Sequence, residues 1–362
     1  MRTSYDVLVM GASYGSLLAT KLLLAGHSVK LVCLPAEAEL INKEGTRVRL
    51  PVKGRKELVE IDSRQLPGRL TAAVPQAVSP AGFDLVVLAM QEPQYRASGV
   101  RELLNAVALA RIPCLSIMNM PPLPYLARIP RLSASAFRHC YTDPSVWDNL
   151  APACLTLCSP DAQAFRPPEE KINVLQVGLP TNFRAARFES DDHTAMLRQM
   201  QAQIEAIRFD TGRGVVELPV KLKVHDSVFV PLAKWCMLLT GNYRCIQRGG
   251  MRSIRDAVHG DIEQSRYVYN WVSELCRKLG ASAEDQVPFE KYAEAALGLL
   301  KPSSVARALA GGATDIERVD RLVKSIAAKE DMNCDAVDEV IAVVDERLAD
   351  NRRKALAAVA TH

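Results

Sequence analysis

The sequence predicts a two-domain α/β protein: an N-terminal domain built on a parallel sheet, followed by an all-helical C-terminal domain. In the first half, short apolar runs rich in β-formers alternate with segments of helical periodicity, as in sheets with helical crossovers. From about residue 226 to 350, nearly every segment has helical periodicity instead. The 362 residues are enough for two domains with sizeable cores. We place these domains at residues 1–215 and 216–362.

The first half opens with a βαβ pattern in residues 5–34. An apolar run at 7–10 and a glycine-containing turn lead into a leucine-rich helical segment at 16–25, and Gly26 stands at the helix C-cap position. A second apolar run at 29–33 completes the unit, whose crossover forces its strands to be parallel. A glycine turn before a helix N-terminus suits a phosphate, because unpaired N–H groups and the helix dipole favour negative charge there. We therefore predict a Rossmann-type unit that binds a dinucleotide.

The glycine turn departs from the usual G-x-G-x-x-G fingerprint. Counting from Gly11, Ser13 and Ser16 occupy the second and third glycine positions, and Gly15 comes one residue early. Either the loop is one residue shorter than usual or the pyrophosphate site is altered, and a βαβ unit that binds nothing remains an alternative. The candidate cofactor-binding residues of the turn are Gly11, Ala12, Ser13, Tyr14, Gly15 and Ser16.

The remaining pattern of the first half continues the alternation of strands and helices. We expect strands at 46–50, 57–61, 83–89, 112–118 and 173–178, and helices at 35–45, 94–110 and 191–207. Asp191 or Asp192 would cap the last of these helices. Residues 120–170 are rich in proline, which predicts short strands and loops packed over the sheet edge.

The second half predicts a helical bundle. Its clearest helices are expected at 232–246, 261–279, 315–328 and 335–350, with Gly280 as a C-cap glycine. Apolar positions such as Val340, Ile341 and Val344 leave open whether this domain carries a homodimer contact or packs them in its own core.

Composition excludes several classes of function. The net charge of +4 is spread without a lysine or arginine block, so nothing indicates a nucleic-acid partner. The nine cysteines include no C-x-x-C pair and predict free thiols in a reducing cytoplasm. His139 and Cys140 with Cys154 and Cys158 match no known zinc spacing, so we expect no metal. No apolar stretch has the length of a signal peptide or a membrane span.

The helical half contains one candidate for proton transfer. Lys234, Leu238 and Asn242 follow the spacing i, i+4, i+8, which places them on one face of one helix. A lysine on such a face could act as a proton donor, and desolvation would lower its pKa toward a useful range. By spacing alone, a solvated or snorkelling lysine explains the pattern better.

Four pieces of sequence, taken together, resemble the ketopantoate reductase family, whose members reduce 2-dehydropantoate to pantoate with NADPH. They are Gly15-Ser-Leu-Leu-Ala with Gly26-His-Ser-Val, Ile117-Met-Asn119, Leu232-Ala-Lys234 through Asn242, and Lys301-Pro-Ser-Ser304 with Thr314-Asp315-Ile. The resemblance covers nearly the whole chain. It implies a step of pantothenate biosynthesis, with the active site in the cleft between the two domains.

The resemblance also implies roles for single residues. Lys234 would be the general acid that protonates the ketone oxygen, and Asp315 would orient this lysine or a substrate hydroxyl. The substrate's hydroxyl and carboxylate would be held by Asn242 and by Ser303 or Ser304, whose register is ambiguous. Asn119 would lie near the nicotinamide and the substrate.

Several positions depart from the family pattern. The family's asparagine four residues after the lysine is Leu238 here, and Asp315 replaces a glutamate. Gln91 stands where the family has a lysine that faces the cofactor, and Leu34 stands where a basic residue reads the NADPH 2′-phosphate. An NAD enzyme would have an acid there. The departures cluster at the site, which favours a changed substrate or cofactor preference within the same scaffold.

The predicted function is an NADP-dependent reductase of a small 2-oxo acid, first of all 2-dehydropantoate, with NAD as the alternative cofactor. A second reading is an opine-type or other 2-hydroxy-acid dehydrogenase on a related fold. A third is a nucleotide-binding sensor or scaffold without turnover, because the site residues are substituted.

Overall fold

The computed structural model describes residues 4–360, and the chain divides into two compact units. The N-terminal unit consists of the first 90 residues together with 94–125 and 145–231. The helical unit consists of 232–362 together with two short segments from the first half, 91–93 and 126–144.

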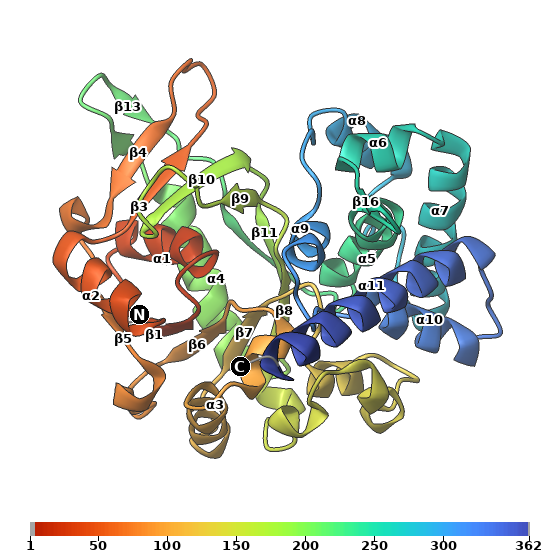
Figure 1. Ribbon diagram of the computed structural model, residues 1–362. Coiled ribbons are helices and arrows are strands. Elements are labelled where there is room, and N and C mark those ends of the chain that lie inside the picture. Colours follow the sequence, from red (N-terminus) through yellow and green to blue (C-terminus); the bar gives the residue numbers. More distant parts are fainter. Residues whose placement is uncertain (1–3, 361–362) are drawn as a thin grey trace. The chain divides into compact units, whose positions relative to one another are not determined.

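The elements of the N-terminal unit alternate as expected for an α/β sheet (Figure 1). Its strands are β1 Asp6–Met10, β2 Ser28–Val32, β3 Arg47–Leu50, β4 Val59–Asp62, β5 Leu70–Ala73, β6 Leu85–Leu88, β7 Cys114–Ile117, β8 Leu155–Ser159, β9 Gln163–Phe165, β10 Val174–Leu179, β11 Phe183–Ala186, β12 Phe209–Asp210, β13 Val215–Val216 and β14 Leu222–His225. Its α-helices are α1 Gly15–Leu24, α2 Pro35–Glu44, α3 Val100–Leu109 and α4 Asp191–Ala206.

The main sheet has eight strands in the order β14-β11-β8-β7-β6-β1-β2-β5. From β1 the chain first adds β2 and β5 on one side, then returns to add β6, β7 and β8 on the other, all in parallel. The order reverses between β1 and β6, which makes their carboxyl ends the topological switch point. The predicted Rossmann-type domain is thereby confirmed.

The central strands are buried on both faces. In β1, Val7 and Val9 belong to the large core that also takes side chains from α1 and α4, whereas Leu8 and Met10 are buried on the opposite face. Because successive side chains point to opposite faces, a strand covered on both sides must be apolar throughout. This explains why these strands read as continuous apolar runs in the sequence.

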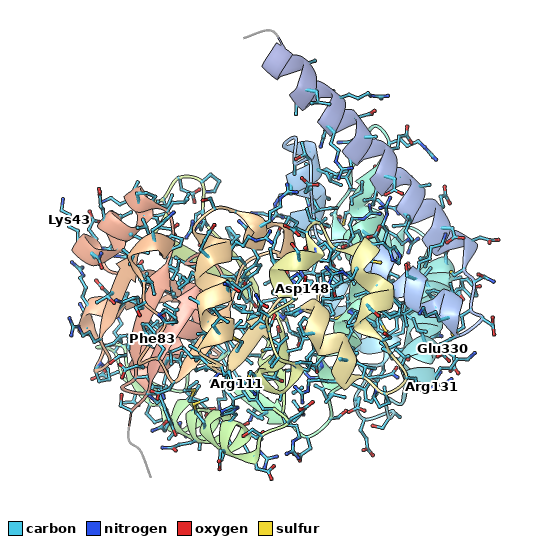
Figure 2. All side chains as sticks on the ribbon, turned by 90° about the horizontal axis from the view of Figure 1, so that it is seen from below. Lys43, Phe83, Arg111, Arg131, Asp148 and Glu330 are labelled. Atoms are coloured by element: carbon cyan, nitrogen blue, oxygen red, sulfur yellow. The ribbon has the colours of Figure 1, made fainter. Side chains whose placement is uncertain are left out.

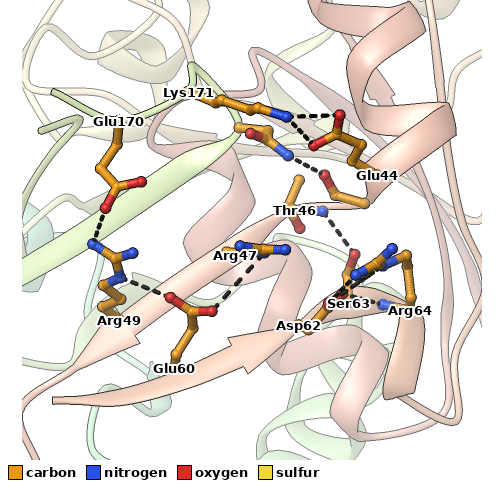
Figure 3. A network of polar contacts seen from close by, with 12 residues as sticks. Glu44, Thr46, Arg47, Arg49, Glu60, Asp62, Ser63, Arg64, Glu170 and Lys171 are labelled. Atoms are coloured by element: carbon orange, nitrogen blue, oxygen red, sulfur yellow. Dashed lines mark hydrogen bonds and ion pairs between the residues drawn. The ribbon is translucent and has the colours of Figure 1, made fainter. Parts of the chain in front are cut away.

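A smaller sheet, in the order β4-β3-β10-β9, packs into the same core. Val48 and Leu50 of β3 face inward. On the outer face, Arg49 forms ion pairs of 2.7 Å with both Glu60 and Glu170 (Figure 3). These side chains are between 24% and 39% exposed, so the network contributes little to the free energy of unfolding.

The helical unit contains α5 Lys234–Met237, α6 Ile254–His259, α7 Ile262–Leu279, α8 Phe289–Ala296, α9 Ser304–Ala310, α10 Val319–Lys329 and α11 Asp335–Ala360, with a hairpin of β15 Ile246–Gln247 and β16 Gly250–Met251. Residues 126–144 are joined to these helices by side chains. Arg131 forms an ion pair of 3.4 Å with Glu330, which lies beside it in Figure 2, and donates to the carbonyl of Lys278. The predicted C-terminal helical domain is confirmed.

Several predicted elements differ in detail. Ser190, not Asp191 or Asp192, caps α4, because its hydroxyl accepts from the His193 N–H. The proline-rich region contributes β8, which pairs with β7 and β11 inside the main sheet and does not merely pack over its edge. The helix expected from residue 315 begins at Val319.

Three further features bear on expectations from the sequence. All nine cysteines are free, and eight of them are buried. None of the helices in residues 4–360 combines the length and the apolar character that a membrane crossing requires. Ile341 and Val344 are buried within the helical unit, so these apolar positions of α11 serve its own core.

Lys21 is a buried lysine on α1. Its side chain is 1% exposed, and its Nζ donates to the carbonyl of Pro219 at 2.5 Å. Burial, and then the charge of Lys221, lower the pKa of Lys21 to about 7. An unfolded chain would hold this proton up to the ordinary lysine pKa of 10.5. Between these two values the unfolded state binds more protons, so stability must rise with pH.

We predict that Lys21→Met removes this rise. In the wild-type protein Lys21 adds up to about 1.4 kcal/mol per pH unit to the free energy of unfolding above pH 7. Urea unfolding between pH 6.5 and 9 measures the slope. Lys43→Met, at an exposed lysine of α2, serves as the control and should keep the wild-type slope. Equal slopes in the Lys21 variant and the control would contradict the assignment.

Candidate functional site

The glycine turn lies at the switch point of the main sheet. Gly11 follows β1 with a φ of 110°, and its N–H donates to the carbonyl of Val32 at 3.0 Å. A Cβ at Gly11 would lie 2.6 Å from Met90 Cγ and 2.7 Å from the Ala89 carbonyl oxygen, just after β6. The turn therefore requires glycine here, both for its backbone conformation and for its close approach to the neighbouring strand.

Gly15 performs the packing role of the last fingerprint glycine. It begins α1, and a Cβ there would lie 2.6 Å from Val9 Cγ1 and 3.2 Å from Ala89 Cβ. The helix can approach the sheet only because this atom is missing. Gly15 therefore lets α1 pack against the sheet one residue earlier than in the usual fingerprint. Ser13, at the middle position, is exposed, and its carbonyl accepts from both the N–H and the hydroxyl of Ser16.

The other cofactor candidates follow strand ends. Asn119 comes two residues after β7 and is half-buried between the buried Met118 and Met120. Gln91 follows β6, is exposed, and belongs to the helical unit. Leu34 follows β2 and is 74% exposed. The carboxyl ends of parallel strands are where open α/β sheets bind ligands.

In the helical unit, Lys234 is the first residue of α5 and only 8% exposed. The predicted continuous α-helix does not continue past it. A π-helical turn, Leu238–Asn242, follows the single turn of α5, and a 3₁₀ turn follows that. The change of helix type alters the angle per residue, so Lys234, Leu238 and Asn242 do not share one α-helical face. Single π turns inside helices occur frequently at functional sites.

Close packing holds the π turn in place. Its residues 238–241 are buried. A Cβ at Gly241 would lie 2.0 Å from the hydroxyl oxygen of Tyr292, so only glycine fits. That hydroxyl donates to the Met237 carbonyl at 3.2 Å, at the junction of α5 and the π turn. Arg244, buried on the other side, donates to the Thr240 carbonyl and to the Ser265 hydroxyl.

The structure separates the two serine candidates. Ser303 is 3% exposed and caps α9; its hydroxyl accepts from the Ala306 N–H and donates to the Asn242 carbonyl at 2.6 Å. Ser304 is the first residue of α9 and is exposed. Ser303 thus joins the π turn to α9, while Asn242 and Ser304 remain beside this joint.

Asp315 lies on the segment before α10. Its carboxylate accepts from Arg352 of α11 at 2.9 Å and from the Thr314 hydroxyl at 3.1 Å. Arg352 also donates to the Thr314 carbonyl, and Asn351 donates to the carbonyls of Leu309 and Ala313. The C-terminal helix α11 therefore fixes the loop that carries Asp315.

Glu317 and Glu92 are buried carboxylates of the helical unit that the sequence did not predict. Glu317 is 6% exposed, and its carboxylate accepts from the Glu92 N–H at 3.3 Å. Glu92 is 2% exposed, and its own carboxylate accepts from the N–H and the hydroxyl of Thr142. The hydroxyl of Tyr243, next to Asn242, donates to the Glu317 carbonyl. Nothing in the local sequence marks Glu317 as more buried than Asp315 two positions earlier.

Directly after Glu317 in the chain, Arg318 and Asp320 form a buried ion pair. Arg318, at the N-cap of α10, bonds through Nε and Nη2 to both carboxylate oxygens of Asp320, which is fully buried, and through Nη1 to Asp345 of α11. Burial alone would lower the pKa of Arg318, but hydrogen bonds and charges of these two aspartates raise it overall. The pair anchors the chain just after Asp315 and Glu317.

Solved structures share this fold over almost the whole chain. The structure of D-mandelate dehydrogenase with NADH and anilino(oxo)acetate has a TM-score of 0.62 at 12% identity, covering 96% of this chain and 99% of that chain. The 2-dehydropantoate 2-reductase of Methylococcus capsulatus also has a TM-score of 0.62 at 12% identity, covering 96% of this chain and 97% of that one.

A PanE/ApbA-family ketopantoate reductase of Ralstonia eutropha gives a TM-score of 0.61 at 16% identity, covering 96% of this chain and 99% of that chain. No protein-family model matches the sequence, and no curated protein matches it by sequence. The chain therefore has the fold of the ketopantoate reductases, as the sequence resemblance predicted, and at these identities the likeness establishes the fold alone.

We predict that Asp320→Asn lowers the free energy of unfolding by about 3–5 kcal/mol, because it leaves the buried guanidinium of Arg318 without its main counter-charge. Urea unfolding at pH 7 measures the change. Glu274→Gln removes an exposed pair with Arg277 on α7 and should change stability by less than about 1 kcal/mol. A loss in the Asp320 variant no larger than in this control would refute the buried-pair argument.

Proposed function

We propose that this protein is a nicotinamide-dependent reductase of a small 2-oxo acid, with 2-dehydropantoate as the first candidate substrate. The single observation that carries the proposal is Lys234, a nearly buried lysine at the first position of a helix that breaks into a π turn. The fold adds support, because solved structures of 2-dehydropantoate 2-reductases have it.

The N-terminal unit would hold the cofactor. The turn of Gly11 to Ser16 offers backbone N–H groups at the start of α1 for a phosphate, and the missing Cβ atoms at Gly11 and Gly15 let the turn and the helix lie against the sheet. The reduced nicotinamide would supply a hydride to the carbonyl carbon. Asn119, at the end of β7, would lie near it.

The helical unit would hold the substrate. As negative charge develops on the carbonyl oxygen, the Lys234 ammonium would stabilise it and donate the proton that completes the hydroxyl group. Asn242 and Ser304 would bind the substrate's polar groups. We assign this role to Ser304 rather than Ser303, because the Ser303 hydroxyl already serves the α9 cap and the Asn242 carbonyl. Asp315, on the loop that Arg352 fixes, would orient Lys234 or a substrate hydroxyl.

A second candidate is the reduction of a 2-oxo acid with an aromatic side chain. The structure of D-mandelate dehydrogenase with NADH and anilino(oxo)acetate suggests this class, because the chain shares its fold. We also propose a cytoplasmic location, which the nine free cysteines support, and a homodimer, the state named for the Staphylococcus aureus ketopantoate reductase.

The first test is a titration with NADPH and NADH, followed by nicotinamide fluorescence, with and without 2-dehydropantoate or phenylglyoxylate. We expect binding of a reduced nucleotide and its oxidation when a 2-oxo acid is added. Oxidation with phenylglyoxylate alone would select the second candidate. Binding without oxidation by any 2-oxo acid would favour the sensor, and binding of neither nucleotide would refute the enzyme proposal.

The second test is Lys234→Met. We expect kcat to fall by about 10²–10⁴-fold, because the proton donor is lost, while the affinity for the reduced nucleotide stays within about twofold. Lys291→Met, at an exposed lysine of α8, is the matched control and should keep full activity. Turnover unchanged by the Lys234 substitution would remove this residue from the mechanism.

The third test compares the two serines. Ser304→Ala should raise KM for the 2-oxo acid by about 10-fold or more without changing stability, because it deletes a hydrogen bond to a charged group. Ser303→Ala should instead lower the free energy of unfolding by about 1 kcal/mol, because it removes a helix cap. Steady-state kinetics and urea unfolding of both variants separate the roles, and the reverse pattern would exchange them.

A further inference from the structure

The end of β2 is the place where Rossmann-type sites distinguish NAD from NADP. An acid there accepts the ribose 2′-hydroxyl of NAD, whereas an arginine accommodates the 2′-phosphate of NADP. In this chain Leu34, two residues after β2, has no charge and is 74% exposed. Sequence alone therefore assigns no discriminating residue.

The structure places two charges near this position. Glu37, in the first turn of α2, accepts a hydrogen bond through Oε1 from Nη2 of Arg166. Arg166 follows β9 in the smaller sheet, so it comes from a segment far away in the sequence. The Glu37 side chain is 9% exposed and that of Arg166 is 28% exposed. The ion pair thus fixes the Glu37 carboxylate, and a small part of the side chain stays exposed.

The effect of Glu37 and Arg166 on Cys33 shows where this ion pair lies relative to β2. Cys33 is the first residue after β2. Burial first, and then the charge of Glu37, raise its pKa to about 12, and the charge of Arg166 acts in the opposite direction. Both charges therefore lie close to the carboxyl end of β2, although neither residue belongs to that strand.

The same segment also borders the glycine turn. The hydroxyl of Tyr14, the N-cap residue of α1, donates to the carbonyl of Ala162 at 2.9 Å. Residues 162–166 therefore run from the turn that would hold the pyrophosphate to the strand end that would hold the adenosine ribose. A dinucleotide bound at this turn would extend along this segment with its ribose near Glu37.

We propose that Glu37, held in place by Arg166, accepts the 2′-hydroxyl of the adenosine ribose and makes the site selective for NADH over NADPH. The inference rests on the proposed function and names its cofactor. Arg166 cannot serve as a free phosphate reader, because Glu37 neutralises its charge. A 2′-phosphate would meet the Glu37 carboxylate and be repelled. The resemblance to ketopantoate reductases, in contrast, implies NADPH.

The test is fluorescence titration of the full chain with NADH and with NADPH at one ionic strength. We expect the wild-type protein to bind NADH at least about 10-fold more tightly. Glu37→Gln keeps the side-chain shape and removes the charge, so it should weaken NADH binding and strengthen NADPH binding, reducing the ratio by about 10-fold. Glu39→Gln, at an exposed acid on the same helix, is the matched control and should leave the ratio unchanged.

Arg166→Gln provides a second variant. It leaves the Glu37 charge uncompensated, so NADPH binding should weaken further while NADH binding is kept within a few-fold. Preference of the wild type for NADPH, with loss of that preference in the Arg166 variant, would make Arg166 the phosphate reader and overturn the inference while the proposed function stands. Binding of neither nucleotide would instead overturn the proposed function itself.

Discussion

The close approach of the glycine turn to the central strands is the constraint on which the N-terminal unit depends. Gly11 presses against the backbone after β6, and Gly15 lets α1 lie directly on Val9 of β1. A methyl group at either position would push the turn or α1 away from the central strands and open a gap in a closely packed core. The same contact sets the position of α1, whose residues 15–23 are all buried, and so explains how a lysine of that helix comes to lie in the core.

The helical unit depends on a different constraint, the π turn after Lys234. Tyr292, Arg244 and Ser303 each donate a hydrogen bond to a carbonyl within or next to this turn. A π turn leaves backbone groups out of the regular i to i−4 pattern, and an unsatisfied buried carbonyl is unfavourable. Side chains from other elements satisfy these carbonyls, so tertiary packing maintains the turn, with Lys234 one helical turn before it and Asn242 as its last residue.

Several parts of the fold and of the site could be predicted from local sequence. The βαβ unit followed from apolar runs and a glycine turn, and α7 followed from its periodicity and Gly280, which adopts a φ of 117°. The π turn could not be predicted, because it depends on side chains of other elements that pack against it, Tyr292 and Arg244 among them. Ser303 and Ser304 could not be told apart for a similar reason: which hydroxyl faces Asn242 depends on where α9 packs.

By itself, the sequence determined the α/β class, the first βαβ unit and the buried strands β6 and β7, because periodicity and glycine placement are local properties of the backbone. Only the tertiary structure decided which charges meet. Glu37 and Arg166 are separated by more than a hundred residues, and Asp315 meets Arg352 of a later helix. Electrostatic pairing depends on distance in space, and a parallel sheet and a helical bundle bring together residues that no sequence spacing connects.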